Sequence, residues 1–323
     1  MTGSASRAAG VLLAALLLSA CSVNPALRVA DGVAETVVLG DVPFHPQTDY
    51  QCGPAALATI LGASGVPATP EALAPQVYLP GRQGSLQVEL MSAARRAGRI
   101  PYVVDASTDA LFAQVQAGRP VLVLQNLWVR SVPKWHYAVV TGADAARNQV
   151  VLNSGAKQGL RMGAKAFLRT WDWAGRWGIV ALQPGEMPAA ADPGRYLTAV
   201  ADFEQVAGSV AASVAYQAAL REWPHDPRPH LALGNQAHAG KDAAAAVRHY
   251  RAGLALAPQD PVLGNNIASV LGELGCLPEA QAALERARDG LALDSPWRSA
   301  LEQTALELSD RSRPRSPACD ALR

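Results

Sequence analysis

The stretch Gln47–Leu61, QTDYQCGPAALATIL, places a lone cysteine directly before glycine, proline and an apolar run. Proline suits the first turn of a helix, because its φ angle is already helical and its missing N–H has no partner there in any case. Pro54 therefore predicts a helix over 54–61 with Cys52 at or just before its N-terminus. The positive end of the helix dipole favours the thiolate, which is the nucleophilic form of cysteine. This position predicts a reactive thiol, because a buried structural cysteine does not need it.

A thiol nucleophile needs a base, and the best candidate is His136 at the start of the strand-like run HYAVVTG. Asn153 closes the next strand-like run, VVLNSG, 17 residues later. A hairpin would place the two positions on neighbouring strands, where the amide oxygen of Asn153 could accept the imidazole N–H and fix its tautomer. The alternatives are a strand-end histidine with a local partner and an asparagine that belongs to a turn.

The region 40–184 combines short β-rich runs with helical patterns. Ser85 is expected to cap a helix that ends at Gly98. Because the helices come early and the strands late, the pattern predicts an α+β fold with the cysteine helix packed on an antiparallel sheet. The expected strands cover residues 37–42, 102–104, 121–124, 136–141, 149–152 and 177–182.

Three sequence features of this region together resemble a known family. They are the pattern Gln-x-x-x-x-Cys-Gly-Pro-Ala-Ala-Leu, the segment Gly84-Ser85-Leu86 opening a helix, and Trp135-His136-Tyr-Ala-Val-Val followed by Val-Leu-Asn153. They resemble the papain-like domain of peptidases that cleave bacteriocin leaders after a double glycine.

The resemblance implies a role for four residues. Cys52 would be the nucleophile, His136 the general base and Asn153 the residue that orients the imidazole. Gln47 would share an oxyanion hole with the backbone N–H of Cys52. The sequence departs from the family in having this glutamine five rather than six residues before the cysteine, and asparagine where aspartate is more common. No Gly-rich phosphate loop occurs, so the resemblance does not extend to the transporter and ATP-binding domains that commonly follow.

The N-terminal residues resemble a bacterial lipoprotein signal. An apolar block, Val11–Leu18, leads into LSAC, which ends at Cys21 and resembles a lipobox. This predicts a signal peptide over 1–20, lipidation of Cys21 by acyl chains such as palmitate, and a tether over 21–39. Since Ser22 is not the aspartate associated with inner-membrane retention, we expect an outer-membrane anchor facing the periplasm. The alternative is an ordinary signal followed by a chance cysteine.

The composition changes after residue 184, where prolines and a glycine mark a linker over 185–195. Beyond it, small and aromatic positions recur at a spacing of 34 residues, which is the tetratricopeptide period. The resemblance predicts tetratricopeptide repeats with a capping helix over 196–309 and a tail over 310–323. The aligned columns are Ala212/Ala246/Ala280, Tyr216/Tyr250/Leu284, Ala219/Gly253/Ala287 and Pro224/Pro258.

The two remaining cysteines, Cys276 and Cys319, could form a disulfide in an oxidising compartment, or they could be two unrelated free thiols. The net charge is +1 with no block of like charge, which argues against nucleic acid as a partner. No cluster of metal ligands is visible, so we expect neither a metal nor another cofactor.

These observations favour a membrane-anchored, periplasm-facing cysteine peptidase, a thiol hydrolase whose repeats bind a partner protein or the peptide substrate. The alternative is a non-catalytic lipoprotein that uses the same fold and repeats as a peptide-binding scaffold. An acyltransferase that uses the same thiol is a third possibility.

Overall fold

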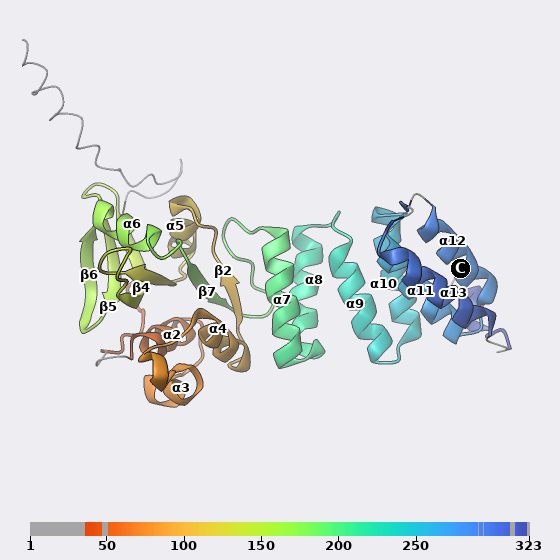
Figure 1. Cartoon of the computed structure of the whole chain (residues 1–323), viewed down its shortest axis with the longest axis horizontal. Helices are drawn as coiled ribbons and strands as arrows, with labels where there is room; N and C mark the ends of the chain where they lie inside the picture. Colours follow the sequence, from red (N-terminus) through yellow and green to blue (C-terminus); the bar gives the residue numbers. More distant parts are fainter. Residues whose placement is uncertain (1–35, 47–50, 290, 293, 311–313, 322–323) are drawn as a thin grey trace, which may run out of the picture. The chain divides into compact units, whose positions relative to one another are not determined.

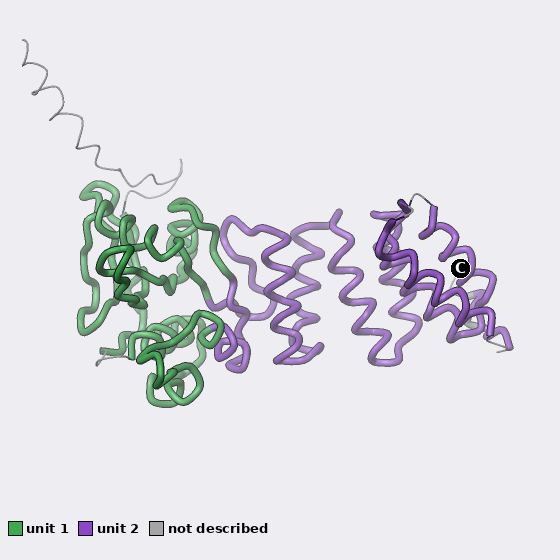
Figure 2. The backbone as a smooth tube through the Cα atoms, in the orientation of Figure 1, with its two compact units in different colours: residues 1–90, 103–180 green, residues 91–102, 181–323 purple. Residues whose placement is uncertain are grey.

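The computed structural model describes residues 36–46, 51–289, 291–292, 294–310 and 314–321. The expected signal peptide, the lipidation site Cys21 and the oxyanion-hole residue Gln47 lie outside the described residues. The chain divides into two compact units, one formed by residues 1–90 and 103–180 and the other by residues 91–102 and 181–323 (Figure 2).

A seven-stranded sheet organises the first half of the chain (Figure 1). Its strand order is β2-β7-β3-β4-β5-β6, and the short strand β1 pairs with β4. The pairs β1–β4, β3–β4, β3–β7, β4–β5 and β5–β6 are antiparallel, which confirms the predicted α+β class. The strands are β1 Thr36–Val38, β2 Ile100–Val103, β3 Val121–Asn126, β4 Trp135–Asp144, β5 Gln149–Ser154, β6 Lys157–Gly163 and β7 Gly178–Leu182.

The helix that begins at Cys52 lies in the interior. In α2, Cys52–Ala63, every residue from Gly53 to Leu61 is buried, and the helix packs against α3, β3 and β4. An apolar surface all round is typical of a helix enclosed on several sides. The other helices of this half are α3 Pro70–Val77, the 3-10 turn η1 Pro80–Arg82, α4 Gln87–Arg96, α5 Thr108–Gln116 and α6 Ala164–Asp172.

Ser85 does not have the capping role that the sequence predicted. The helix α4 starts at Gln87, its first-turn bond runs from the Leu90 N–H to the Leu86 carbonyl, and the Ser85 hydroxyl is buried without a hydrogen-bond partner. The side chain of Ser85 instead packs against Gly53, where an added Cβ would lie 2.4 Å from Oγ. The glycine after Cys52 thus makes room for this contact.

The second half of the chain is entirely helical in its described residues. Its first helix begins at Pro193, inside the stretch expected to be a linker, because the Asp192 side chain caps it by accepting from the Arg195 N–H at 2.8 Å. The helices are α7 Pro193–Ala207, α8 Ser209–Glu222, α9 Arg228–Ala239, α10 Ala243–Leu256, α11 Pro261–Glu273, α12 Leu277–Arg288, α13 Trp297–Ser309 and α14 Ala318–Ala321.

The alanine, glycine, aromatic and leucine positions that recur every 34 residues fall on α8, α10 and α12, and all of them are buried. The two recurring prolines, Pro224 and Pro258, follow α8 and α10 and are exposed. Their size sets how closely the helices approach. A Cβ on Gly234 would lie 2.4 Å from the Tyr250 ring, so α9 and α10 touch where this glycine meets the aromatic. A Cβ on Gly264 would lie 2.5 Å from the Ala287 Cβ, which gives α11 and α12 a similar contact.

A disulfide joins Cys276, the residue before α12, to Cys319 in α14, with an S–S distance of 1.98 Å. Both cysteines are buried. The bond therefore ties the C-terminal segment to the helical core. Among the described residues, no helix is long and apolar enough to cross a membrane.

Candidate active site

Cys52 is the first residue of α2, as its position before Gly53 and Pro54 predicted. The first helical bond runs from the Ala55 N–H to the Gln51 carbonyl at 3.1 Å. The N–H groups of Cys52 and Gly53 precede it and have no partner within the helix. Both act on the Cys52 thiol, so the sulfur lies in a field of backbone N–H donors.

A third donor to the thiol comes from β4. The Leu127 N–H binds the Lys134 carbonyl at 2.9 Å, and in an antiparallel ladder the residues that bond to one neighbour alternate with those that bond to the other. The Tyr137 N–H therefore points away from β3, toward an edge where β5 pairs with β4 only from Val139 onward. The Cys52 thiol occupies this open edge and accepts from the Tyr137 N–H.

Side-chain contacts also hold the start of α2 against β4. The Tyr137 hydroxyl donates to the Ser85 carbonyl at 3.2 Å, and the Tyr137 ring packs edge-on against Trp177 at 6.0 Å. Ser85 in turn packs on Gly53. The nucleophile candidate is thus fixed beside the residue that follows His136.

The electrostatics of the thiol differ from the expectation. Burial raises the pKa of Cys52 above its ordinary value, and the three N–H donors lower it by less. The helix N-terminus does favour the thiolate, but desolvation opposes the charge more strongly. The resting cysteine is therefore a neutral thiol near pH 7, and the predicted depression of its pKa is wrong.

His136 is half-buried as the second residue of β4, directly opposite Gln125 of β3. Burial lowers the pKa of His136 to about 4, and the positive charge of Lys134 adds to the effect. The imidazole is therefore neutral at physiological pH, which is the form that accepts a proton.

The side chain that contacts this imidazole is Ser154, whose Oγ lies 2.9 Å from the His136 Nε2. In this hairpin Val140 pairs with Leu152, and side chains two residues apart on a strand share one face of a sheet. His136 and Ser154 both lie an even number of residues from that pair. They therefore project from the same face and meet diagonally.

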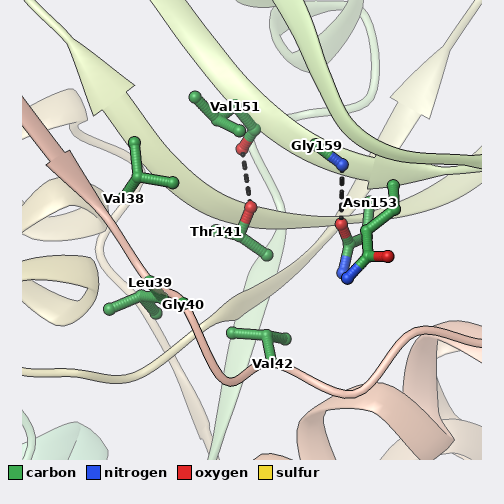
Figure 3. A pocket seen from close by; sticks show the side chains of 9 residues that line it. Val38, Leu39, Gly40, Val42, Thr141, Val151, Asn153 and Gly159 are labelled. Atoms are coloured by element: carbon green, nitrogen blue, oxygen red, sulfur yellow. Dashed lines mark hydrogen bonds between the residues drawn. The ribbon is translucent and has the colours of Figure 1, made fainter.

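Asn153 lies on the other face, which corrects the expectation that it orients His136. It pairs with Val139, and its Oδ1 accepts from the Gly159 N–H at 3.0 Å. It lines a pocket whose other residues come from 38–42, β4, β5 and β6 (Figure 3). The separation of 17 residues brings the strands together, but the register beyond the shift between Val140 and Gly142 gives Asn153 the wrong parity for contact with the imidazole.

Ser154 holds the imidazole less selectively than an amide or a carboxylate would. A carboxylate or an amide oxygen can only accept, so it fixes the proton of His136 on Nε2 and leaves Nδ1 free as a base. A hydroxyl can either donate or accept, and therefore permits both tautomers. Sequence reasoning missed Ser154, because a register shift between Val140 and Gly142 decides which of residues 153 and 154 shares a face with His136.

Residue 51, the other glutamine near the nucleophile, is exposed and serves as the N-cap of α2 without a side-chain cap bond. No group of three or more His, Cys, Asp or Glu side chains within the described ranges is arranged to hold a metal ion.

Comparison with known proteins found a family match for the part of the chain that carries this site. Residues 39–178 match the Peptidase_C39 like family. The matched segment contains the whole cysteine–histidine–serine arrangement. A search of the curated proteins found no match.

Solved structures also resemble this region. A C39-like peptidase from Bacillus anthracis has 18% identity and a TM-score of 0.40, covering 46% of this chain and 98% of its own. The peptidase domain of Streptococcus ComA, a bi-functional ABC transporter involved in a quorum sensing pathway, has 23% identity and a TM-score of 0.34, covering 43% of this chain and 96% of its own.

Proposed function

We propose that the protein is a cysteine peptidase in which Cys52 is the nucleophile and His136 the general base. The observation that carries the proposal is the approach of the Cys52 thiol to the backbone N–H that follows His136, on an edge of β4 left open by β5. The match of residues 39–178 to a peptidase family supports the same assignment.

The pKa shifts favour a concerted mechanism over a preformed ion pair. The Cys52 thiol and the His136 imidazole are both neutral at rest, so His136 takes the thiol proton as the sulfur attacks the peptide carbonyl. The tetrahedral oxyanion would be stabilised by the Cys52 N–H, together with the side chain of Gln47. Protonation of the amine by His136 releases the first product, and water then hydrolyses the thioester.

Ser154 takes the orienting role in this mechanism. When the His136 Nε2–H donates to Oγ, Nδ1 carries the lone pair that accepts the thiol proton. The same hydroxyl stabilises the imidazolium less than a carboxylate would.

The proposal also assigns roles to the helical half and to the N-terminus. We infer that the 34-residue spacing over 196–309 reflects tetratricopeptide repeats, which offer a surface for a partner protein or for the peptide substrate. Lipidation of Cys21 would anchor the chain to a membrane, with the outer membrane facing the periplasm as the expected site.

A second candidate function is peptide binding without catalysis. The raised pKa of Cys52 and the hydroxyl of Ser154 beside His136 both favour it, because each weakens the reactivity of the thiol. An acyltransferase would share the thioester and differ only in the group that accepts the acyl chain.

Digestion of a complex peptide mixture by the purified full chain, followed by mass spectrometry, tests which of these three functions the protein has. A peptidase produces new termini that Cys52→Ala and His136→Ala both abolish. His225→Ala is a matched control for the histidine, since it removes an exposed imidazole between α8 and α9. A peptide-binding protein retains peptides on Cys52→Ala and on the unmodified chain equally and releases no new termini, whereas an acyltransferase forms a thioester that only an added amine discharges.

A further inference from the structure

The connection between β3 and β4 together with the first residue of β4, residues 127–135, exposes an unusual number of large apolar side chains. Trp128 is 62% exposed and Trp135 is 54% exposed. Leu127, Val129 and Val132 are exposed as well, so five of these nine residues present apolar surface to solvent. We refer to residues 127–135 as the apolar hairpin.

The apolar hairpin is ordered by hydrogen bonds. The buried Asn126 accepts the Trp128 and Lys134 N–H groups at 3.1 and 3.0 Å and donates to the Val129 carbonyl at 3.3 Å. A β-bridge joins Val129 to Val132 at the tip. The exposed side chains are thus held outward on a preformed turn, and binding through them would cost little ordering entropy.

The charges of the apolar hairpin all have one sign. Arg130 and Lys134 are both exposed, and 127–135 contains no acidic residue. Tryptophan together with basic side chains is the combination that favours the interface between lipid headgroups and acyl chains. An anionic surface would complement both cations while the apolar side chains leave water.

We propose that the apolar hairpin inserts into the interface of an anionic lipid bilayer. The inference goes beyond the proposed function and does not depend on it, since it rests on exposure and charge alone. It has a consequence for catalysis, because His136 is the residue that follows the apolar hairpin. A membrane-bound hairpin would hold the reaction site at the bilayer surface and restrict it to peptides that reach that surface.

Sedimentation with vesicles tests the proposal on the full chain carrying Cys21→Ser, which removes lipidation as a second anchor. The vesicles contain phosphatidylcholine with or without phosphatidylglycerol. We expect Trp128→Ser/Val132→Ser to weaken binding to the mixed vesicles at least about tenfold, because burial of each side chain is lost. Val210→Ser is the matched control, since Val210 is 85% exposed on α8.

Substitution of the two cations gives a second, independent test. Arg130→Gln and Lys134→Gln should each weaken binding to the mixed vesicles about fivefold, the factor for about 1 kcal/mol per cation. Binding of Cys52→Ala should be unchanged, so failure of the peptidase assignment would leave this result intact. Equal binding by the unmodified chain and the Trp128→Ser/Val132→Ser variant would overturn the proposal. So would normal vesicle binding by that variant combined with a loss of affinity for a soluble peptide, which would identify a peptide-docking surface instead.

Discussion

Replacing Ser154 tests which side chain supports the imidazole, because Ser154 Oγ lies 2.9 Å from Nε2 while Asn153 bonds elsewhere. A hydrogen bond between neutral groups contributes about 0.5–1.5 kcal/mol and one involving a charge about 1.5–3 kcal/mol. Ser154→Asp should therefore stabilise the imidazolium by about 1.4 kcal/mol more than serine does, which raises the thiolate population of Cys52 about tenfold. Ser154→Ala should lower it about fivefold, and Asn153→Ala should leave it unchanged.

The rate of Cys52 alkylation by iodoacetamide at neutral pH reports this population without knowledge of the substrate. The assay uses a Cys21→Ser background, so that an unlipidated Cys21 thiol does not contribute, and the alkylated peptide that contains Cys52 is quantified by mass spectrometry. A loss of rate in Asn153→Ala with no change in Ser154→Ala would refute the assignment of Ser154 and restore the amide as the orienting group.

The pKa of His136, lowered from 6.5 to about 4, makes the folded chain bind this proton less well than the unfolded chain. The free energy of unfolding should fall by about 2–3 kcal/mol as the pH drops from 6.5 toward 4, and in His136→Gln denaturant titrations should lack this part of the loss. Gly53→Ala should destabilise the chain by about 1–3 kcal/mol, since its Cβ would overlap the side chain of Ser85, whose hydroxyl is buried. Gly81→Ala, which meets nothing within 4 Å, should be nearly neutral in the same titration, and equal costs would contradict the packing argument. Replacing Cys276 and Cys319 by serine opens a 43-residue loop and should cost about 4 kcal/mol, seen as a lower denaturant midpoint for the helical half; an unchanged midpoint would show that the loop does not constrain the unfolded chain.

The start of α2 could be predicted because its signals are local. Pro54 fits only the first turn of a helix, and that fixes the position of Cys52 within a residue. The recurrent small residues of the helical half could also be recognised from the sequence, by their regular spacing. All of the aligned alanine, glycine, aromatic and leucine positions are buried, because each fills a contact that repeats with the chain.

The hydrogen-bond partner of His136 could not be predicted from the sequence in the same way, because it depends on strand register. Residues 153 and 154 both lie on the strand next to that of His136. Which of the two shares a face of the sheet with His136 depends on the strand register, and the pairing of Val140 with Leu152 selects residue 154. The strand β6 was not predicted from the sequence, for a related reason. Only two of its seven residues, Leu160 and Met162, are large and apolar, so its pairing with β5 has little local signature.

The pKa of Cys52 was misjudged because the sequence shows the helix N-terminus but not the surrounding burial. Three backbone N–H groups act in the expected direction, yet desolvation dominates. A neutral resting thiol would resist oxidation, because oxidation proceeds through the thiolate. The site would be activated by substrate, when the attacking sulfur and the imidazole share the proton.

Detection of an acyl-enzyme tests the central claim most directly. The full chain is mixed with a complex peptide pool, quenched in acid, and the peptide that contains residue 52 is measured by mass spectrometry. We predict a thioester on Cys52 that accumulates within the first turnover and is absent from His136→Ala. A thiol that iodoacetamide alkylates but that never carries an acyl group, with no new peptide termini in the pool, would contradict the account.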